Sequence, residues 1–371
     1  MAGIDLGCGG AYAFRQLQKE PRGFLWPRRK FKSVRIRGAV VRQQLAGNIA
    51  ERTARVLPTG RRLRATAGMW SVAPAKGRVR RGKNRMAHGV VGPVAGLWRY
   101  PVKSMQGEEL DAVPVSERGF LGDRAYALID KESGKIGSAK NPRRWPKVLD
   151  YRAVFREPPS PDRSSPPVRI DFPDGSGSVS SDSTDVNDRL SRAFNRAVVL
   201  SSAAPVAPSL EEYWPDIDGL AHRETVTDEA IALGAPPGTF FDFSAVHLVT
   251  TATLGALSRA YPQGRFYWHR FRPNIIAESE AEGFPENDWV GRRISIGDEL
   301  TLEVLIPCPR CVMTTLAQSD LPLDSGILRT VAQQNNVMIA PLGQAMPSVG
   351  VYAKVLTGGV VRRGDQVRLM S

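Results

Sequence analysis

The chain has 371 residues, of which 42% are hydrophobic and 24% charged, a composition typical of folded globular proteins and unlike that of disordered chains. Its 35 glycines and 28 prolines favour turns over long helices, and its three cysteines are too few for a disulfide scaffold or an iron–sulfur cluster. No run approaches the roughly 18 apolar residues of a membrane span, and no secretory signal opens the chain, so we expect a cytoplasmic protein.

The net charge of +14 is confined to one end of the chain. Residues 1–85 hold 21 Lys and Arg against three acidic residues, whereas residues 86–371 carry a net charge of −4. We expect residues 1–85 to be a disordered or non-native extension, with one short helix at 42–56. The extension could be a basic arm for nucleic acid or membrane, a transit peptide, or sequence upstream of a true start at Met86. We favour the last and expect no nucleic-acid partner.

Residues 4–10 resemble the glycine loop of S-adenosylmethionine methyltransferases. That loop needs a strand, a helix and an acidic residue after the next strand. The strand expected at 33–37 leads into 38–42 without a carboxylate, so we do not adopt this interpretation.

From residue 90 onward, short apolar runs bounded by Gly, Pro, Asp or Ser predict strands. We expect helices at 184–194 and 251–260, and irregular pocket-wall loops at 211–235 and 316–350. The pattern predicts a mainly β protein with some helices and two folded units, 87–205 and 211–371, each with its own core. The expected strands are 91–100, 126–130, 168–172, 198–201, 247–250, 274–277, 293–296, 300–306, 351–356 and 367–370.

The sharpest motif is Cys308-Pro309-Arg310-Cys311, at the end of an apolar strand. The two thiols could bind zinc or form a redox pair, but the four histidines lack metal-ligand spacing, and the β-branched residues 312–315 do not favour the helix that activates such a pair. A single thiolate beside Arg310 suits a thiophilic metal, and Arg310 could also bind phosphate. The remaining alternative is two buried structural cysteines.

Cations also stand at other predicted strand ends. Lys103 and Ser104 follow the first strand, where a turn can bind an anion. Arg124 opens the second strand. Arg272 precedes Pro273, which predicts an extended conformation at Arg272 and a guanidinium suited to phosphate. His247 and His269 lie in or beside apolar strands, so we expect structural roles for them.

Four motifs in this order resemble the MOSC family, named for the molybdenum cofactor sulfurase C-terminal domain. They are Tyr100-Pro101-Val102-Lys103-Ser104, Gly122-Asp123-Arg124, Arg270-Phe271-Arg272-Pro273-Asn274 and Cys308-Pro309-Arg310-Cys311. The resemblance runs from about residue 90 to the end of the chain. It implies a MOSC N-terminal β-barrel domain followed by a MOSC β-barrel domain.

The resemblance implies that Cys311 ligates molybdenum and is the catalytic residue. It implies that the pterin and its phosphate are held by Lys103, Ser104, Arg124, Arg272 and Asn274, and that Ser244 makes a further contact. The implied cofactor is molybdopterin, and pyridoxal phosphate binding is a further property implied at the level of the family.

The implied activity is a molybdenum-dependent oxidoreductase that removes oxygen from small N-hydroxylated or N-oxide substrates. Electrons are expected from a separate reductase or ferredoxin. Two alternatives stay open: a sulfur or cofactor carrier that holds a persulfide on Cys311, and a binding barrel whose cysteines are structural.

Overall fold

The computed structural model describes residues 89–162, 165–218, 220 and 222–370. These residues form nineteen strands and three α-helices, which confirms the mainly β prediction. None of their helices has the length and hydropathy needed to cross a membrane. The predictions made for residues 1–85, among them the helix at 42–56 and the glycine loop at 4–10, lie outside the described residues.

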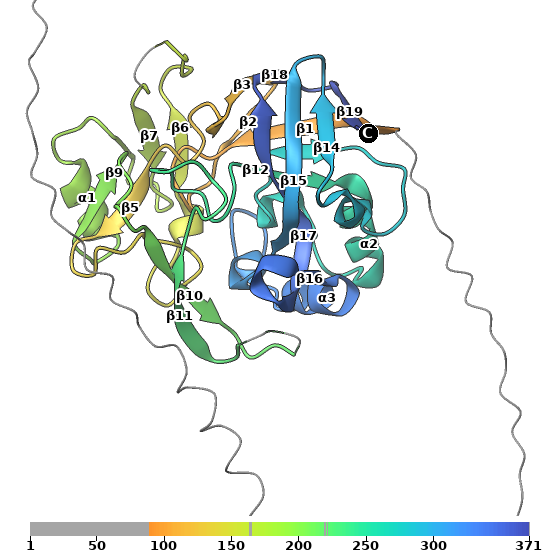
Figure 1. Cartoon of the computed structure of the whole chain (residues 1–371). Helices are drawn as coiled ribbons and strands as arrows, with labels where there is room; N and C mark the ends of the chain where they lie inside the picture. The colour runs from red at the N-terminus through yellow and green to blue at the C-terminus, as the bar shows by residue number, and fades with distance from the viewer. Residues whose placement is uncertain (1–88, 163–164, 219, 221, 371) are drawn as a thin grey trace, which may run out of the picture. The chain divides into compact units, whose positions relative to one another are not determined.

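Seven strands close into a barrel (Figure 1). The barrel closes because β12 pairs in parallel with β13 on one side and antiparallel with β17 on the other. The strand that opens the described chain, β1, pairs with β19 near its end. In order around the barrel the strands are β12 (Val246–Thr250), β13 (Ile275–Ala277), β1 (Val90–Arg99), β19 (Gln366–Leu369), β14 (Arg293–Ile296), β15 (Leu300–Pro309) and β17 (Gln344–Thr357). Two further strands extend this sheet, β2 (Glu108–Leu110) on β1 and β16 (Asn336–Ile339) on β17.

The barrel interior is filled by aliphatic side chains that alternate along the strands. In β15, Leu300, Leu302 and Val304 are fully buried, and the residues between them are half-buried. This alternation is the two-residue period of a strand with one face in a core. Val94 and Leu97 of β1 belong to the same core as Val351 and Ala353 of β17, so both ends of the described chain contribute to one barrel core.

Smaller sheets, formed mainly by the N-terminal half of the described chain, lie beside the barrel (Figure 1). A second core, built around Leu128, Trp145, Ile170 and Leu190, fills this half. The sheets are β18-β3-β4, β5-β9, β6-β7-β8 and β10-β11. Their strands are β3 (Ala112–Ser116), β4 (Gly119–Phe120), β5 (Ala127–Asp130), β6 (Arg152–Phe155), β7 (Val168–Asp171), β8 (Ser178–Ser180), β9 (Val198–Ser201), β10 (Ser209–Trp214), β11 (Thr225–Ala230) and β18 (Gly359–Arg362), with helix α1 (Val186–Ala193).

The helix expected at 251–260 is α2 (Thr251–Ala260), which begins where the Thr250 hydroxyl accepts a hydrogen bond from the Thr253 N–H at 3.2 Å. The two predicted loops were wrong in part. Residues 211–235 contain most of the β10–β11 hairpin, whose second strand is polar and lacks apolar alternation. Residues 316–350 contain α3 (Gly326–Gln334), β16 and the start of β17. Short 3-10 helices are η1 (Val148–Asp150), η2 (Trp268–Arg270), η3 (Pro285–Trp289), η4 (Val312–Thr315) and η5 (Ala340–Leu342).

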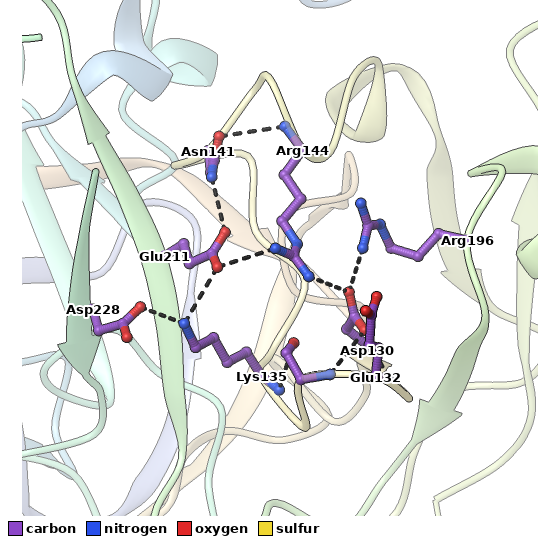
Figure 2. Close-up of polar contacts among 9 residues, drawn as sticks. Asp130, Glu132, Lys135, Asn141, Arg144, Arg196, Glu211 and Asp228 are labelled. Carbon is purple, nitrogen blue, oxygen red and sulfur yellow. Dashed lines mark hydrogen bonds and ion pairs between the residues drawn. The ribbon is translucent and has the colours of Figure 1, made fainter. Parts of the chain in front are cut away.

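An ion-pair network joins the end of β5 to the β10–β11 hairpin (Figure 2). The carboxylate of Asp130, 1% exposed, accepts from Arg144 at 3.0 Å and from Arg196 at 2.6 Å. Arg144 also donates to Glu211 of β10 at 3.2 Å, and Lys135 donates to the same carboxylate at 3.2 Å. The network therefore fixes the hairpin against the N-terminal half of the described chain.

Candidate functional site

Several chain segments meet around a small cavity of about 50 Å³. They are the loops before β5, β12 and β13, the end of β15, and strand β17. Six of the predicted site residues line the cavity: Arg124, Ser244, Arg272, Asn274, Arg310 and Cys311. Lys103 and Ser104 do not line it. The described structure thus brings together predicted site residues that lie as much as 187 positions apart in sequence.

Cys311 supplies the sulfur that faces the cavity. Strand β15 ends at Pro309, and the Arg310 N–H is held by the Pro347 carbonyl at 2.7 Å. Cys311 then packs with Met313 against the N-terminal core and is only 7% exposed. The expectation that residues 312–315 avoid a helix was wrong, since they form η4. That helix has four residues, and burial raises the pKa of Cys311 to about 12, so the thiol is not activated in the way of a redox dithiol.

Cys308 lies on the other side of the motif. It is fully buried, is absent from the cavity lining, and accepts a hydrogen bond from Arg310 Nη1 at 2.9 Å. Both cysteines are free. The two sulfurs of the motif therefore have different surroundings, one at the cavity and one beneath it.

Two guanidinium groups lie against the aromatic ring of Tyr100. The Arg124 and Arg272 guanidinium carbons lie 4.5 and 4.2 Å from the centroid of its ring. Its hydroxyl donates to the Pro273 carbonyl at 3.2 Å. Arg124 also forms an ion pair with Asp123. The aromatic ring thus holds two cations close together in spite of their mutual repulsion.

Three predicted site residues have left-handed backbone conformations that non-glycine residues rarely adopt. The φ angles of Ser104, Arg124 and Arg272 are 66°, 48° and 55°. Such strain often accompanies functional positions. The extended conformation predicted for Arg272 was therefore wrong. Its N–H caps η2 by donating to the Trp268 carbonyl at 2.9 Å, and a left-handed residue is a common way to end a helical turn.

Lys103 and Ser104 do not line the cavity but bind to loops that form its wall. Lys103 Nζ donates to Asp242 Oδ1 and to the Phe240 carbonyl, both at 2.7 Å. Burial lowers the pKa of Lys103, although Asp242 opposes the shift. Ser104 Oγ accepts from the Ala139 N–H at 3.1 Å. These two residues therefore hold the loops that carry Asp242 and Lys140, which do line the cavity.

Asn274 and Ser244 connect the cavity wall to neighbouring elements. Asn274 Nδ2 donates to Asp123 Oδ2 at 2.8 Å, and its Oδ1 accepts from the His247 N–H at 3.1 Å. Ser244 Oγ donates to the Ala353 carbonyl at 2.8 Å. The Asn274 amide therefore holds the turn at Gly122-Asp123-Arg124 in place through Asp123.

Four further polar residues of the wall were not among the predicted site residues: Lys140, Asp242, His247 and Tyr352. Asp242 stands two residues before Ser244, and that spacing could have pointed to it. His247 was expected to be structural, and its Nε2 is indeed within 3.0 Å of the Val349 carbonyl. Lys140 carries no pattern that distinguishes it from a surface lysine, yet its ammonium pairs with Glu212 at 3.0 Å.

The charges around the cavity leave an excess of positive charge. Lys140 and Arg124 have carboxylate partners, but within the described ranges neither Arg272 nor Arg310 forms an ion pair with a carboxylate. Both side chains are 7% exposed. Burial lowers the pKa of Arg272 to about 10, so it remains charged at neutral pH. Two buried cations beside a thiol form a site suited to an anionic ligand.

Family models match two consecutive parts of the chain. The MOSC N-terminal β-barrel domain matches residues 91–187, and the MOSC domain matches residues 236–368. The second match contains β12 to β18 and most of β19, together with Arg272, Arg310 and Cys311, and the first contains Lys103, Ser104 and Arg124.

Curated relatives match most of the chain at low identity. Mitochondrial amidoxime reducing component 2 of Rattus norvegicus is 26% identical over 326 residues, covering 82% of this chain and 90% of the relative. The Homo sapiens protein of the same name is 26% identical over 310 residues, covering 76% and 84%.

Among solved structures, the YUAD protein from Bacillus subtilis matches with a TM-score of 0.36 and 13% identity, covering 75% of this chain and 95% of that one. The two family matches lie in the order that the four sequence motifs indicate. The chain therefore contains a MOSC N-terminal β-barrel domain, matched over residues 91–187, ahead of a MOSC domain, matched over residues 236–368.

Proposed function

We propose that this chain binds the molybdenum cofactor at the cavity and reduces small N-hydroxylated or N-oxide compounds. Cys311 is the proposed metal ligand. The observation that carries the proposal is the pair of buried guanidinium groups, Arg272 and Arg310, that face the cavity beside this thiol without a carboxylate partner in the described residues. The relatives are named for amidoxime reduction, which supports amidoximes as the first substrates to test.

The residues present fit such a cofactor by their chemistry. A soft sulfur ligand suits molybdenum, and the cations suit a phosphate and a dithiolene. The cavity around Cys311 holds only about 50 Å³, but an adjoining cavity of about 280 Å³ shares Arg124 and Phe241 with it. A pterin with its phosphate would need both spaces. We therefore expect the side chains of Arg124 and Phe241, which form the shared wall, to move when the cofactor binds.

The chain's own residues would bind and orient the cofactor. Arg124, Arg272 and Arg310 offset its negative charge, Cys311 loses its proton on ligation, and Asn274 and Ser244 hold the surrounding loops in place. Bound there, the cofactor would supply two-electron chemistry with oxygen-atom transfer. Reduction of an N–OH group to N–H also consumes two protons and releases water. The electrons would come from a separate reductase or ferredoxin.

The alternative of a sulfur carrier gains no support from the site. A persulfide carrier must present its sulfur to a partner protein, and Cys311 is 7% exposed with a raised pKa. The alternative of a binding barrel with structural cysteines accounts for Cys308, but it leaves the cationic group of Arg272 at the cavity without a ligand.

An assay of amidoxime reduction tests the proposed reaction. The full chain, made in a host that synthesises molybdopterin, is supplied with a reduced viologen and an aryl amidoxime, and the amidine product is measured. We expect turnover by the unaltered chain, a loss of at least about 100-fold in Cys311→Ser, and full activity in the matched control Cys8→Ser. Equal activity in Cys311→Ser would overturn the assignment of the ligand.

A further inference from the structure

The buried sulfur of Cys308 is in direct contact with the guanidinium of Arg310. Arg310 Nη1 lies 2.9 Å from Cys308 Sγ. Charge-assisted hydrogen bonds are shorter than neutral ones. Because sulfur is a large atom, 2.9 Å is a short distance for a contact with it. Cys308 is fully buried, so water does not screen this contact.

No carboxylate in the described part of the chain takes this place beside Arg310. Its Nη2 donates to the Phe271 carbonyl at 3.1 Å, and its Nε is buried without a hydrogen-bond partner. An isolated buried guanidinium lowers the free energy of unfolding, and a negative group nearby is needed to offset this loss of stability. Cys308 is the group in contact with Arg310 that can become negative.

The other groups that face Cys308 come from the neighbouring barrel strands. They are His247 of β12 and Tyr352 of β17, which pair with each other in the ladder that closes the barrel. Burial of the thiol raises its pKa, but the nearby His247, Arg310 and Tyr352 side chains outweigh this effect and bring the pKa below its usual value. The pKa of Cys311 shifts in the opposite direction.

We propose that Cys308 is a thiolate at neutral pH and is the counter-ion that positions Arg310 at the cavity. The thiolate and its pairing with Arg310 stand on the contacts described above. The consequence for cofactor retention rests in addition on the function proposed for the cavity. The two cysteines of the motif then have separate roles: Cys308 orients the cation, and Cys311 presents the sulfur. Cys308 is a positioning residue, since it does not line the cavity.

Thiolate absorbance near 240 nm tests the first part without reference to activity. The full chain is made in a host that lacks molybdopterin synthesis, and its spectrum is recorded at pH 7.5. We expect Cys308→Ser to lose the absorbance of one thiolate per chain and Cys311→Ser to keep it. Arg310→Gln should also lose the thiolate absorbance, because Cys308 then has no guanidinium beside it to stabilise the negative charge. Equal spectra for the unaltered chain and Cys308→Ser, or full absorbance in Arg310→Gln, would overturn the pairing.

Molybdenum content tests the second part. In a molybdopterin-competent host we expect Cys308→Ser to retain about 10-fold to 100-fold less molybdenum, as substitutions behind a metal ligand do, and Cys308→Asp to restore part of it. Circular dichroism establishes that each variant is folded. If the unaltered chain binds no molybdenum, the proposed function fails while the spectroscopic test of the thiolate stands. If folded Cys308→Ser binds as much as the unaltered chain, the positioning role fails.

Discussion

The guanidinium of Arg272 is buried at the cavity with its charge balanced by no carboxylate among the described residues, and it stacks on Tyr100. A buried charge of this kind lowers stability in the absence of its ligand. Its left-handed backbone adds to that cost. These features are expected where a residue serves binding at the expense of stability.

Arg272→Met removes the charge and keeps much of the length of the side chain. We expect the free energy of unfolding of the cofactor-free protein to be unchanged or to rise by about 1–3 kcal/mol, because an uncompensated buried charge is lost. Cofactor content should fall at least about 10-fold. Chemical denaturation and metal analysis measure the two effects, and the exposed Arg368→Met is the matched control. A clear loss of stability with unchanged cofactor content would contradict this account of Arg272.

At the scale of elements, the ion-pair network around Asp130 joins β5 to the β10–β11 hairpin (Figure 2). Burial raises the pKa of Asp130, but hydrogen bonds from Arg144, Arg196 and two backbone N–H groups outweigh it and lower the pKa to about 2. The ordinary value is 3.8, and the difference corresponds to roughly 2 kcal/mol. Because the folded-state pKa is the lower one, this stabilisation is present above pH 4 and is lost as pH falls from about 4 to 2.

Asp130→Asn should therefore lower the free energy of unfolding at pH 7 by about 2 kcal/mol or more, since two arginines lose their shared carboxylate. Asp228→Asn provides the control, because Asp228 belongs to the same network but its side chain is 63% exposed. Exposed pairs contribute about 0–1 kcal/mol. Denaturation at pH 7 and at pH 3 measures both, and the gap between Asp130→Asn and the unaltered chain should narrow at pH 3. A gap independent of pH would rule out the electrostatic explanation.

The closure of the barrel depends on a glycine at the β12–β17 contact. Gly350 has φ +75°, and a Cβ there would lie 2.4 Å from the Leu248 carbonyl oxygen and 2.6 Å from His247 Nε2. Gly350→Ala should therefore cost at least about 3 kcal/mol. Gly343 has φ +64°, and a Cβ added to it would meet none of the described atoms within 4 Å, so Gly343→Ala should cost only about 1–2 kcal/mol of backbone strain. Thermal and chemical denaturation measure the loss of stability in each variant. Equal losses in Gly350→Ala and Gly343→Ala would show that steric crowding at the β12–β17 contact does not contribute.

At the scale of the whole described chain, the barrel needs strands from both ends of it. β1 lies between β13 and β19, and Val94 and Leu97 lie in the barrel core. A fragment of residues 211–371 lacks β1 and leaves the edges of β13 and β19 unpaired. We expect this fragment not to unfold cooperatively, whereas a fragment of residues 86–371 should unfold like the full chain. Circular dichroism during heating measures both, and a cooperative transition of the shorter fragment would contradict the shared barrel.

Sequence patterns predicted the mainly β fold and most barrel strands, because buried strands such as β15 alternate regularly between Gly and Pro boundaries. The sequence patterns did not predict β11, because this strand is polar and is stabilised by its backbone pairing with β10. The motifs predicted six residues that line one cavity. Lys140 and Tyr352 also line it, but no sequence motif predicts them, because only tertiary packing places them there. Pro273 led to a wrong prediction of an extended backbone at Arg272. The left-handed conformation that ends η2 outweighs the preference of a residue before proline for an extended backbone.

Molybdenum per chain is the most direct measurement of the central claim that Cys311 and the surrounding cations hold the cofactor. The full chain, purified from a molybdopterin-competent host, is analysed by elemental mass spectrometry beside Cys311→Ser and Cys8→Ser. We expect molybdenum near one per chain in the unaltered protein and in Cys8→Ser, and nearly complete loss in Cys311→Ser. An unaltered chain without molybdenum that carries a cyanide-labile sulfur on Cys311 would contradict the cofactor assignment and would favour the sulfur carrier.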